Sequence, residues 1–150
     1  MVASYNRSIM RSESTSLSES IETTMDPSKA KALECARAAI EKKAENVKVL
    51  DLTELSSFTD FFVVCSGMSD RQLQAISESV EEAMAQAGKE LLAIEGYGEG
   101  RWILMDFGDV IVHVFLDALR EYYDLEKLWA DAPRVKVPSE FYGTAASRLN

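Results

Sequence analysis

Residues 95–115 read EGYGEGRWILMDFGDVIVHVF, and this stretch decides the fold. Two apolar runs, 102–105 and 110–115, are separated by a short polar turn that contains Gly108. Glycine readily adopts the positive φ that tight turns between strands need. Because each run is apolar at successive positions, the stretch predicts a β-hairpin in a sheet that is covered on both faces. A short helix is expected over 122–129, with its apolar residues folding back onto the hairpin.

Two longer helices are expected upstream of the hairpin. Asp26 is a good N-cap and Pro27 suits the first helical position, so the first helix starts there and runs to residue 43. Ser69 caps the second helix, which runs to residue 87. Apolar strand patterns occupy residues 47–52, 61–65 and 89–95. This order predicts an α/β fold, with a mixed β-sheet of about five strands and helices packed on it.

The predicted elements occupy residues 25–131, between two tails. Residues 1–24 are rich in Ser and Thr and lack hydrophobic periodicity, which indicates a disordered tail. This tail has no apolar segment typical of a secretory signal, and its acidic residues are unusual in transit peptides, so a cytoplasmic location is expected while a plastid one stays open. Residues 132–150 contain two prolines and no periodic pattern, which indicates a flexible C-terminal tail. No apolar stretch approaches the ~20 residues of a membrane helix, so no membrane partner is expected.

The formal net charge of −9 at pH 7 bears on the kind of partner. Binding to nucleic acids relies on Lys and Arg side chains that neutralise phosphates, so no direct DNA binding is expected. An acidic protein suits a basic protein partner better, because complementary charge steers association. The simpler alternative, that the acidity only keeps the protein in solution, stays open.

Catalytic groups are hard to find in the sequence. His113 is the only histidine and lies inside a predicted strand, which favours a structural or surface-contact role over a catalytic one. The best catalytic candidate is the strand-to-helix turn from Ser66 to Asp70, which loosely resembles the Gly-Ser turn of nucleotidyltransferases. Those enzymes hold Mg²⁺ with a pair of carboxylates. Here Asp70 has no acidic partner beside it, because the next residue is Arg71. A capped helix start explains the turn better, so the sequence predicts no enzyme, no metal site and no cofactor.

A glycine-rich loop at 96–100 also needs an interpretation. Phosphate-binding glycine loops are followed by a helix, because its N-terminus binds the anion. Here a predicted strand follows instead, so the loop is interpreted as a flexible connection between strands.

Several short motifs follow one another between residues 30 and 131. In order they are LSSFTDFFVVCSG at 55–67, SDRQ at 69–72, EG at 95–96, GRW at 100–102, DFGDV at 106–110, VHVF at 112–115, REYY at 120–123 and LEKLW at 125–129. Together they resemble the ribosomal silencing factor family, also called Iojap-like. The resemblance covers about two-thirds of the chain and is far more specific than any single motif.

The resemblance implies a homodimeric α/β domain that is similar in fold to nucleotidyltransferases but lacks their activity. It also implies a translation repressor that binds the large ribosomal subunit through ribosomal protein 14, blocks joining of the small subunit and lowers translation when nutrients are scarce. The apolar runs of the sheet exceed what two long helices can cover, which agrees with a second copy. A nucleotidyltransferase-like enzyme that uses the turn from Ser66 to Asp70 is the alternative.

The hairpin and its flanks are the expected partner-binding site. An end strand can present side chains to a partner, and Trp102, Leu104 and Asp106 alternate onto one face. The expected contacts are Arg101, Trp102, Leu104, Asp106, His113 and Tyr123. The competing interpretation is that this face is simply core, in which case removing the side chain of Trp102 unfolds the domain.

Overall fold

Six strands form one sheet in the order β3-β4-β5-β2-β1-β6 in the computed structural model, which describes residues 25–143. The central strands β2 and β5 are parallel, and every other neighbouring pair is antiparallel. The strands are β1 (Glu45–Asp51), β2 (Phe61–Gly67), β3 (Ala93–Glu95), β4 (Trp102–Asp106), β5 (Val110–Leu116) and β6 (Arg134–Val135). The mixed α/β sheet predicted from the sequence is therefore confirmed.

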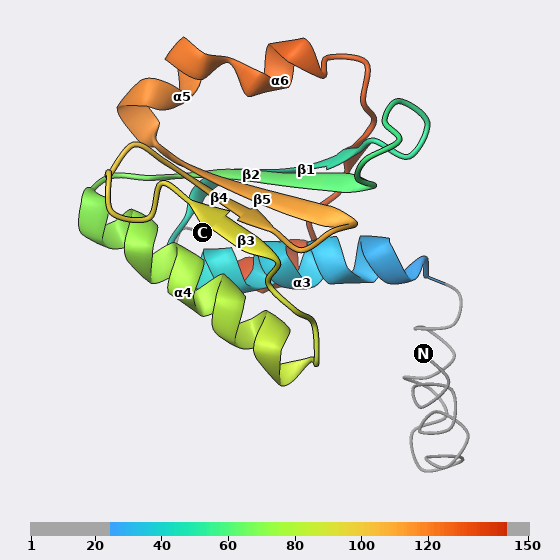
Figure 1. The fold of residues 1–150 in the computed structure, drawn as a ribbon, viewed down its shortest axis with the longest axis horizontal. Coiled ribbons are helices and arrows are strands. Elements are labelled where there is room, and N and C mark those ends of the chain that lie inside the picture. The colour runs from blue at the N-terminus through green and yellow to red at the C-terminus, as the bar shows by residue number, and fades with distance from the viewer. Residues whose placement is uncertain (1–24, 144–150) are drawn as a thin grey trace.

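Two long helices, α3 (Pro27–Glu41) and α4 (Asp70–Gln86), cover one face of this sheet (Figure 1). Both begin at the predicted caps: the Asp26 side chain accepts a hydrogen bond from the Ser28 amide, and the Ser69 hydroxyl accepts one from the Gln72 amide. The buried side of α3 is rich in alanine, so this helix lies close to its neighbours, and the Ser79 hydroxyl on α4 donates to one of its carbonyls. The larger part of the core lies in this layer.

Two short helices, α5 (Asp117–Tyr123) and α6 (Leu125–Leu128), lie over the opposite face (Figure 1). The single helix expected over 122–129 is wrong in detail, because the chain breaks at Asp124, whose φ of 51° is left-handed. A smaller core cluster lies beneath these helices and includes Phe62 and Phe115. Tyr123 and Trp129 pack on this cluster while staying only partly buried.

The chain beyond residue 132 adds an edge strand to the sheet. The sequence suggested a flexible tail here, but β6 pairs with β1, with Val135 opposite Val49. The 3-10 helix η2 (Ser139–Tyr142) follows, and Val137 and Phe141 pack against the main core. This strand is the sixth, where about five were expected. Residues 1–24, the expected N-terminal tail, and residues 144–150, the end of the expected C-terminal tail, lie outside the described residues. No helix within residues 25–143 is long and apolar enough to cross a membrane.

Candidate partner-binding site

Strand β4 presents three half-buried side chains on the sheet face beneath α5 and α6. Trp102, Leu104 and Asp106 alternate with the fully buried Ile103 and Met105, which point into the main core. The alternation expected from the sequence is thus present. The turn after β4 also follows the prediction, because a glycine with a φ of 92° occupies it.

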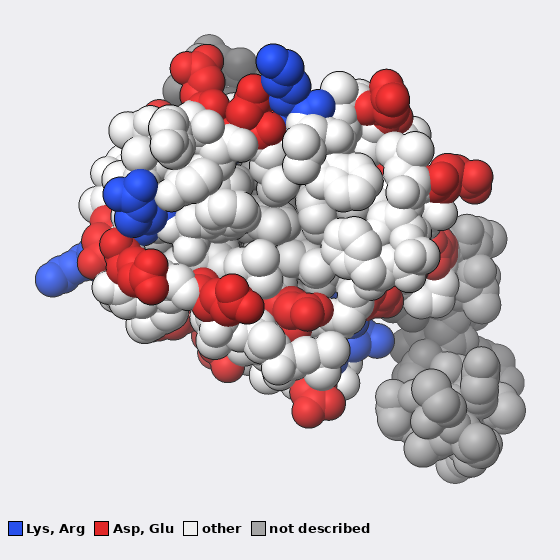
Figure 2. Space-filling model, turned by 45° about the horizontal axis from the view of Figure 1, so that its top comes forward, with Lys and Arg blue, Asp and Glu red and all other residues white. Residues whose placement is uncertain are grey.

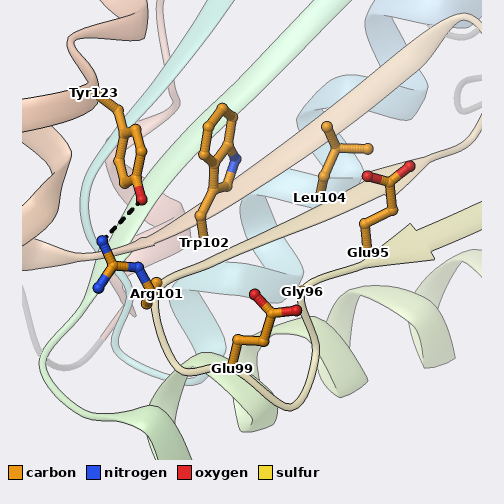
Figure 3. Close-up of a pocket in the computed structure, with 7 residues that line it drawn as sticks. All are labelled: Glu95, Gly96, Glu99, Arg101, Trp102, Leu104 and Tyr123. Atoms are coloured by element: carbon orange, nitrogen blue, oxygen red, sulfur yellow. Dashed lines mark hydrogen bonds between the residues drawn. The ribbon is translucent and has the colours of Figure 1, made fainter.

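Four of the six predicted contact residues lie together around one pocket. A cavity of about 280 Å³ opens between β4, the β3–β4 connection and α5 (Figure 3). Its lining consists of Glu95, Gly96, Glu99, Arg101, Trp102, Leu104 and Tyr123. The glycine-rich segment, which the sequence analysis interpreted as a mere connection, therefore forms one wall of the pocket.

Aromatic rings and a guanidinium group form the opposite wall. The Tyr123 and Trp102 ring centroids are 4.9 Å apart, and Trp102 also packs on Phe115 at 4.8 Å. The Arg101 Nη2 atom donates to the Tyr123 hydroxyl at 3.1 Å, and this hydrogen bond raises the pKa of Arg101 above its ordinary value. The guanidinium of Arg101 thereby stays beside α5 (Figure 3).

His113 supports this wall from below and is only 3% exposed. Its Nδ1 atom accepts a hydrogen bond from Trp102 Nε1 at 3.1 Å, and its ring meets the Phe62 ring edge-on at 4.5 Å. Burial lowers the pKa of His113 to about 3, so the ring is neutral at pH 7 and carries its proton on Nε2. Its predicted place among the contact residues needs correction, because the ring is covered and instead orients Trp102.

Asp106 lies apart from the pocket, at the turn end of β4. Its Oδ1 atom accepts a hydrogen bond from the Gly108 amide at 2.8 Å, which stabilises the turn. Asp106 therefore shapes the hairpin, and its half-exposed carboxylate lies outside the cavity lining.

Arg120 fixes α5 and α6 to the sheet, a role that the sequence analysis missed. Its side chain is buried and donates to the Asn46 carbonyl at 2.7 Å and to the Ser66 hydroxyl at 3.0 Å. Two of its nitrogens also donate to the two oxygens of Glu126, each at 3.0 Å. Such bidentate pairs restrict orientation, so Arg120 holds α5, and with it Tyr123, in place. The available signal was an arginine close to the two tyrosines of the REYY segment at 120–123.

The turn from Ser66 to Asp70 makes structural contacts. Ser66 is fully buried against Arg120, Ser69 caps α4, and Asp70 packs beside Gly100 of the glycine-rich loop. No second carboxylate accompanies Asp70 in this turn, and the acid of the hairpin turn, Asp109, forms an ion pair with Lys31 at 2.6 Å. Within the described range, no group of three or more His, Cys, Asp or Glu residues is arranged to hold a metal ion.

The surface around the pocket is apolar at its centre and acidic at its edge. Figure 2 tilts the α5–α6 side toward the viewer: uncharged residues fill most of its middle, and around them lie mostly carboxylates with a few Lys and Arg side chains. Several large apolar side chains are exposed in this region, among them Phe58 at 61%, Tyr122 at 77% and Leu128 at 79%. A broad exposed apolar area of this kind marks an interaction surface.

Several known proteins are similar in sequence to this chain. The chain is 46% identical over 100 residues to the ribosomal silencing factor RsfS of Halalkalibacterium halodurans, covering 67% of this chain and 86% of that protein. It is 34% identical over 110 residues to the chloroplastic protein Iojap of Zea mays, covering 71% and 46%. A mouse protein, mitochondrial assembly of ribosomal large subunit protein 1, is 32% identical over 92 residues, covering 59% and 40%.

A crystal structure and a family model extend the match. The crystal structure of a Chromobacterium violaceum protein superposes with a TM-score of 0.68 at 35% identity, covering 77% of this chain and 92% of that one. The model of the family described as "Ribosomal silencing factor during starvation" matches residues 25–148. The chain therefore belongs to the ribosomal silencing factor family, whose members are not enzymes.

Proposed function

We propose that this protein represses translation by binding the large ribosomal subunit through ribosomal protein 14, which blocks joining of the small subunit. The observation that carries the proposal is the exposed pocket, because Trp102, Tyr123 and Arg101 converge on it. Trp, Tyr and Arg are the residue types that dominate binding hot spots. The name of the mouse relative, which refers to the large ribosomal subunit, supports the choice of subunit.

Charge supports a basic protein as the surface that is contacted. The chain carries a net charge of −9, and carboxylates outnumber Lys and Arg side chains around the uncharged centre of the pocket side (Figure 2). Carboxylates repel RNA phosphates and attract Lys and Arg, so the ribosomal contact is expected on protein. We place this activity in the cytoplasm, and we propose that the protein acts as a homodimer.

Trp102→Ala tests the proposal. Loss of an aromatic anchor typically costs ~2 kcal/mol or more, which is about thirtyfold in affinity. The variant is therefore expected to lose co-sedimentation with isolated large subunits at a temperature where its melting curve shows it to be folded. Tyr142→Ala, which removes a partly exposed aromatic residue from η2, is the matched control and is expected to bind normally.

Arg101→Ala is a second variant, because Arg101 is exposed and its removal leaves the core intact. Folded Trp102→Ala and Arg101→Ala proteins that still co-sediment with wild-type affinity would contradict the proposed site. A photo-cross-linking residue at Tyr123 is expected to label ribosomal protein 14. Wild-type protein that leaves subunit joining unchanged in a sucrose gradient would contradict the proposed function itself.

A further inference from the structure

The pocket has two electrically different ends. Arg101 lies at one end, where Tyr123 accepts its hydrogen bond, and the Glu95 carboxylate lies at the other end beside Leu104 (Figure 3). The Glu99 side chain extends from the connecting loop between these two ends. Trp102 and Leu104 lie between them. Both glutamates are exposed, and neither forms a salt bridge with any residue in the described range 25–143.

The backbone fixes the positions of these carboxylates. Glu95 is the last residue of β3 and pairs with Leu104, so the two side chains are neighbours on one sheet face. Gly96 follows with a φ of 80°, and a Cβ atom there would overlap the Trp102 carbonyl oxygen. The Glu99 amide then donates to the Gly96 carbonyl at 3.2 Å. The loop is thus bound closely to β4, so that Glu95 lies beside Leu104 while Glu99 lies on the loop nearer to Arg101 and Trp102 (Figure 3).

An apolar floor with a carboxylate end matches the chemistry of a long basic side chain. Lys and Arg carry an apolar stem below a cationic head, and the stem packs readily on apolar surface. Tryptophan is also the aromatic residue that best attracts a cation over its ring face. A volume of about 280 Å³ is at the lower limit for small-molecule sites, which suits one inserted side chain better than a metabolite.

We propose that this pocket receives one Lys or Arg side chain of the ribosomal partner. The stem lies along Trp102 and Leu104, and the cationic head lies between the carboxylates of Glu95 and Glu99. Arg101 does not oppose the incoming charge directly, because its guanidinium is held at the α5 end by Tyr123. The inference rests on the proposed function and adds the chemical group that the site selects.

Two double variants with equal changes in net charge test this inference. Glu95→Gln with Glu99→Gln removes both carboxylates from the pocket and keeps the side-chain size. Glu81→Gln with Glu82→Gln removes two exposed carboxylates from α4, which covers the other face of the sheet. The measurement is the affinity for isolated large subunits at low and at physiological salt. Melting curves of both variants are expected to match that of the wild type.

The pocket variant is expected to bind large subunits about tenfold more weakly than the wild type and with a smaller loss of affinity on adding salt, because a specific ion contact is gone. The affinity of the α4 variant is expected to stay within about twofold of that of the wild type, because it changes only the long-range attraction that depends on net charge. Equal affinities of the two variants would overturn the inference and leave the proposed function standing. Wild-type protein that fails to bind large subunits at all would overturn both.

Discussion

At the scale of single residues, the ring of His113 has an unusual environment for an ionisable group. It is packed between Phe62 and Trp102, and its Nε2 atom has no hydrogen-bond partner among the described residues. A proton on Nδ1 would break the hydrogen bond from the Trp102 indole, and a charge in this place would lack water. Folding therefore favours the neutral form of the His113 ring.

This environment predicts a pH dependence of stability. The folded pKa of about 3 lies below the ordinary value of 6.5, so between these values the unfolded chain binds a proton that the folded protein does not. The contribution of His113 to the free energy of unfolding is fully present above pH 6.5. It falls by about 1.4 kcal/mol per pH unit as the pH is lowered toward 3. Denaturant unfolding at pH 7.5 and pH 5 is expected to show a loss of about 2 kcal/mol from this residue.

His113→Gln is the control for this prediction. Glutamine keeps an acceptor for the indole N–H of Trp102 but has no titrating proton. The free energy of unfolding of this variant is expected to fall about 2 kcal/mol less than that of the wild type over the same pH range. An equal fall in the two proteins would show that protonation of His113 is not linked to unfolding.

At the scale of elements, the β3–β4 connection carries a second prediction. Gly96→Ala places a Cβ atom against the Trp102 carbonyl oxygen at a positive φ, so a cost of more than about 2 kcal/mol is expected, together with loss of large-subunit binding. Gly98→Ala, two residues on in the same loop, has no atom within 4 Å of its new methyl group and is expected to change stability by less than about 0.5 kcal/mol. Thermal melting measures both effects. Similar melting temperatures for the two variants would contradict a closely fitted loop.

Elements with strong local signals could be predicted from the sequence. The caps at Asp26 and Ser69 and the glycine turn of the hairpin lie where they were expected, because each depends on neighbouring residues alone. Strand β6 could not be predicted, because a strand of two residues shows no periodicity. Its strand conformation depends on pairing with the distant strand β1. The break between α5 and α6 is similar, because the ion pair of Arg120 with Glu126 spans it.

The site could be predicted only in part, for a related reason. The alternation along β4 identified Trp102 and Leu104, which line the pocket. It could not distinguish the covered His113 from an exposed contact, because the covering rings come from other strands. Glu95 and Glu99 were missed because the path of a loop depends on the surface against which it packs.

At the scale of the whole molecule, we expect dimerisation and large-subunit binding to respond to salt in opposite directions. Two copies that each carry −9 repel each other, while Phe58, Tyr122 and Leu128 offer apolar surface for a dimer. Salt screens the repulsion, so dimerisation is expected to strengthen between about 0.05 and 0.5 M salt, where the screening length falls severalfold. Binding to large subunits is expected to weaken over the same range.

Sedimentation velocity at tens of micromolar, an order-of-magnitude concentration for detecting weak dimers, measures the first of these responses. The mass of the sedimenting species is expected to rise from monomer toward dimer as salt is added. A monomer at every salt concentration would contradict the homodimer.

The strand order also has a consequence for how the chain folds during its own synthesis. Only β1 with β2 and β4 with β5 are local pairings among the inner strands. The centre of the sheet pairs β2 with β5, and β6 pairs with the outer side of β1, so both of these pairings join segments that are distant in the chain. Non-local pairing of this kind slows folding. At about 5–20 residues per second, the strands made first wait several seconds for their partners. A protein proposed to act on ribosomes thus completes its sheet only after residues 134–135 have left the ribosome that made it.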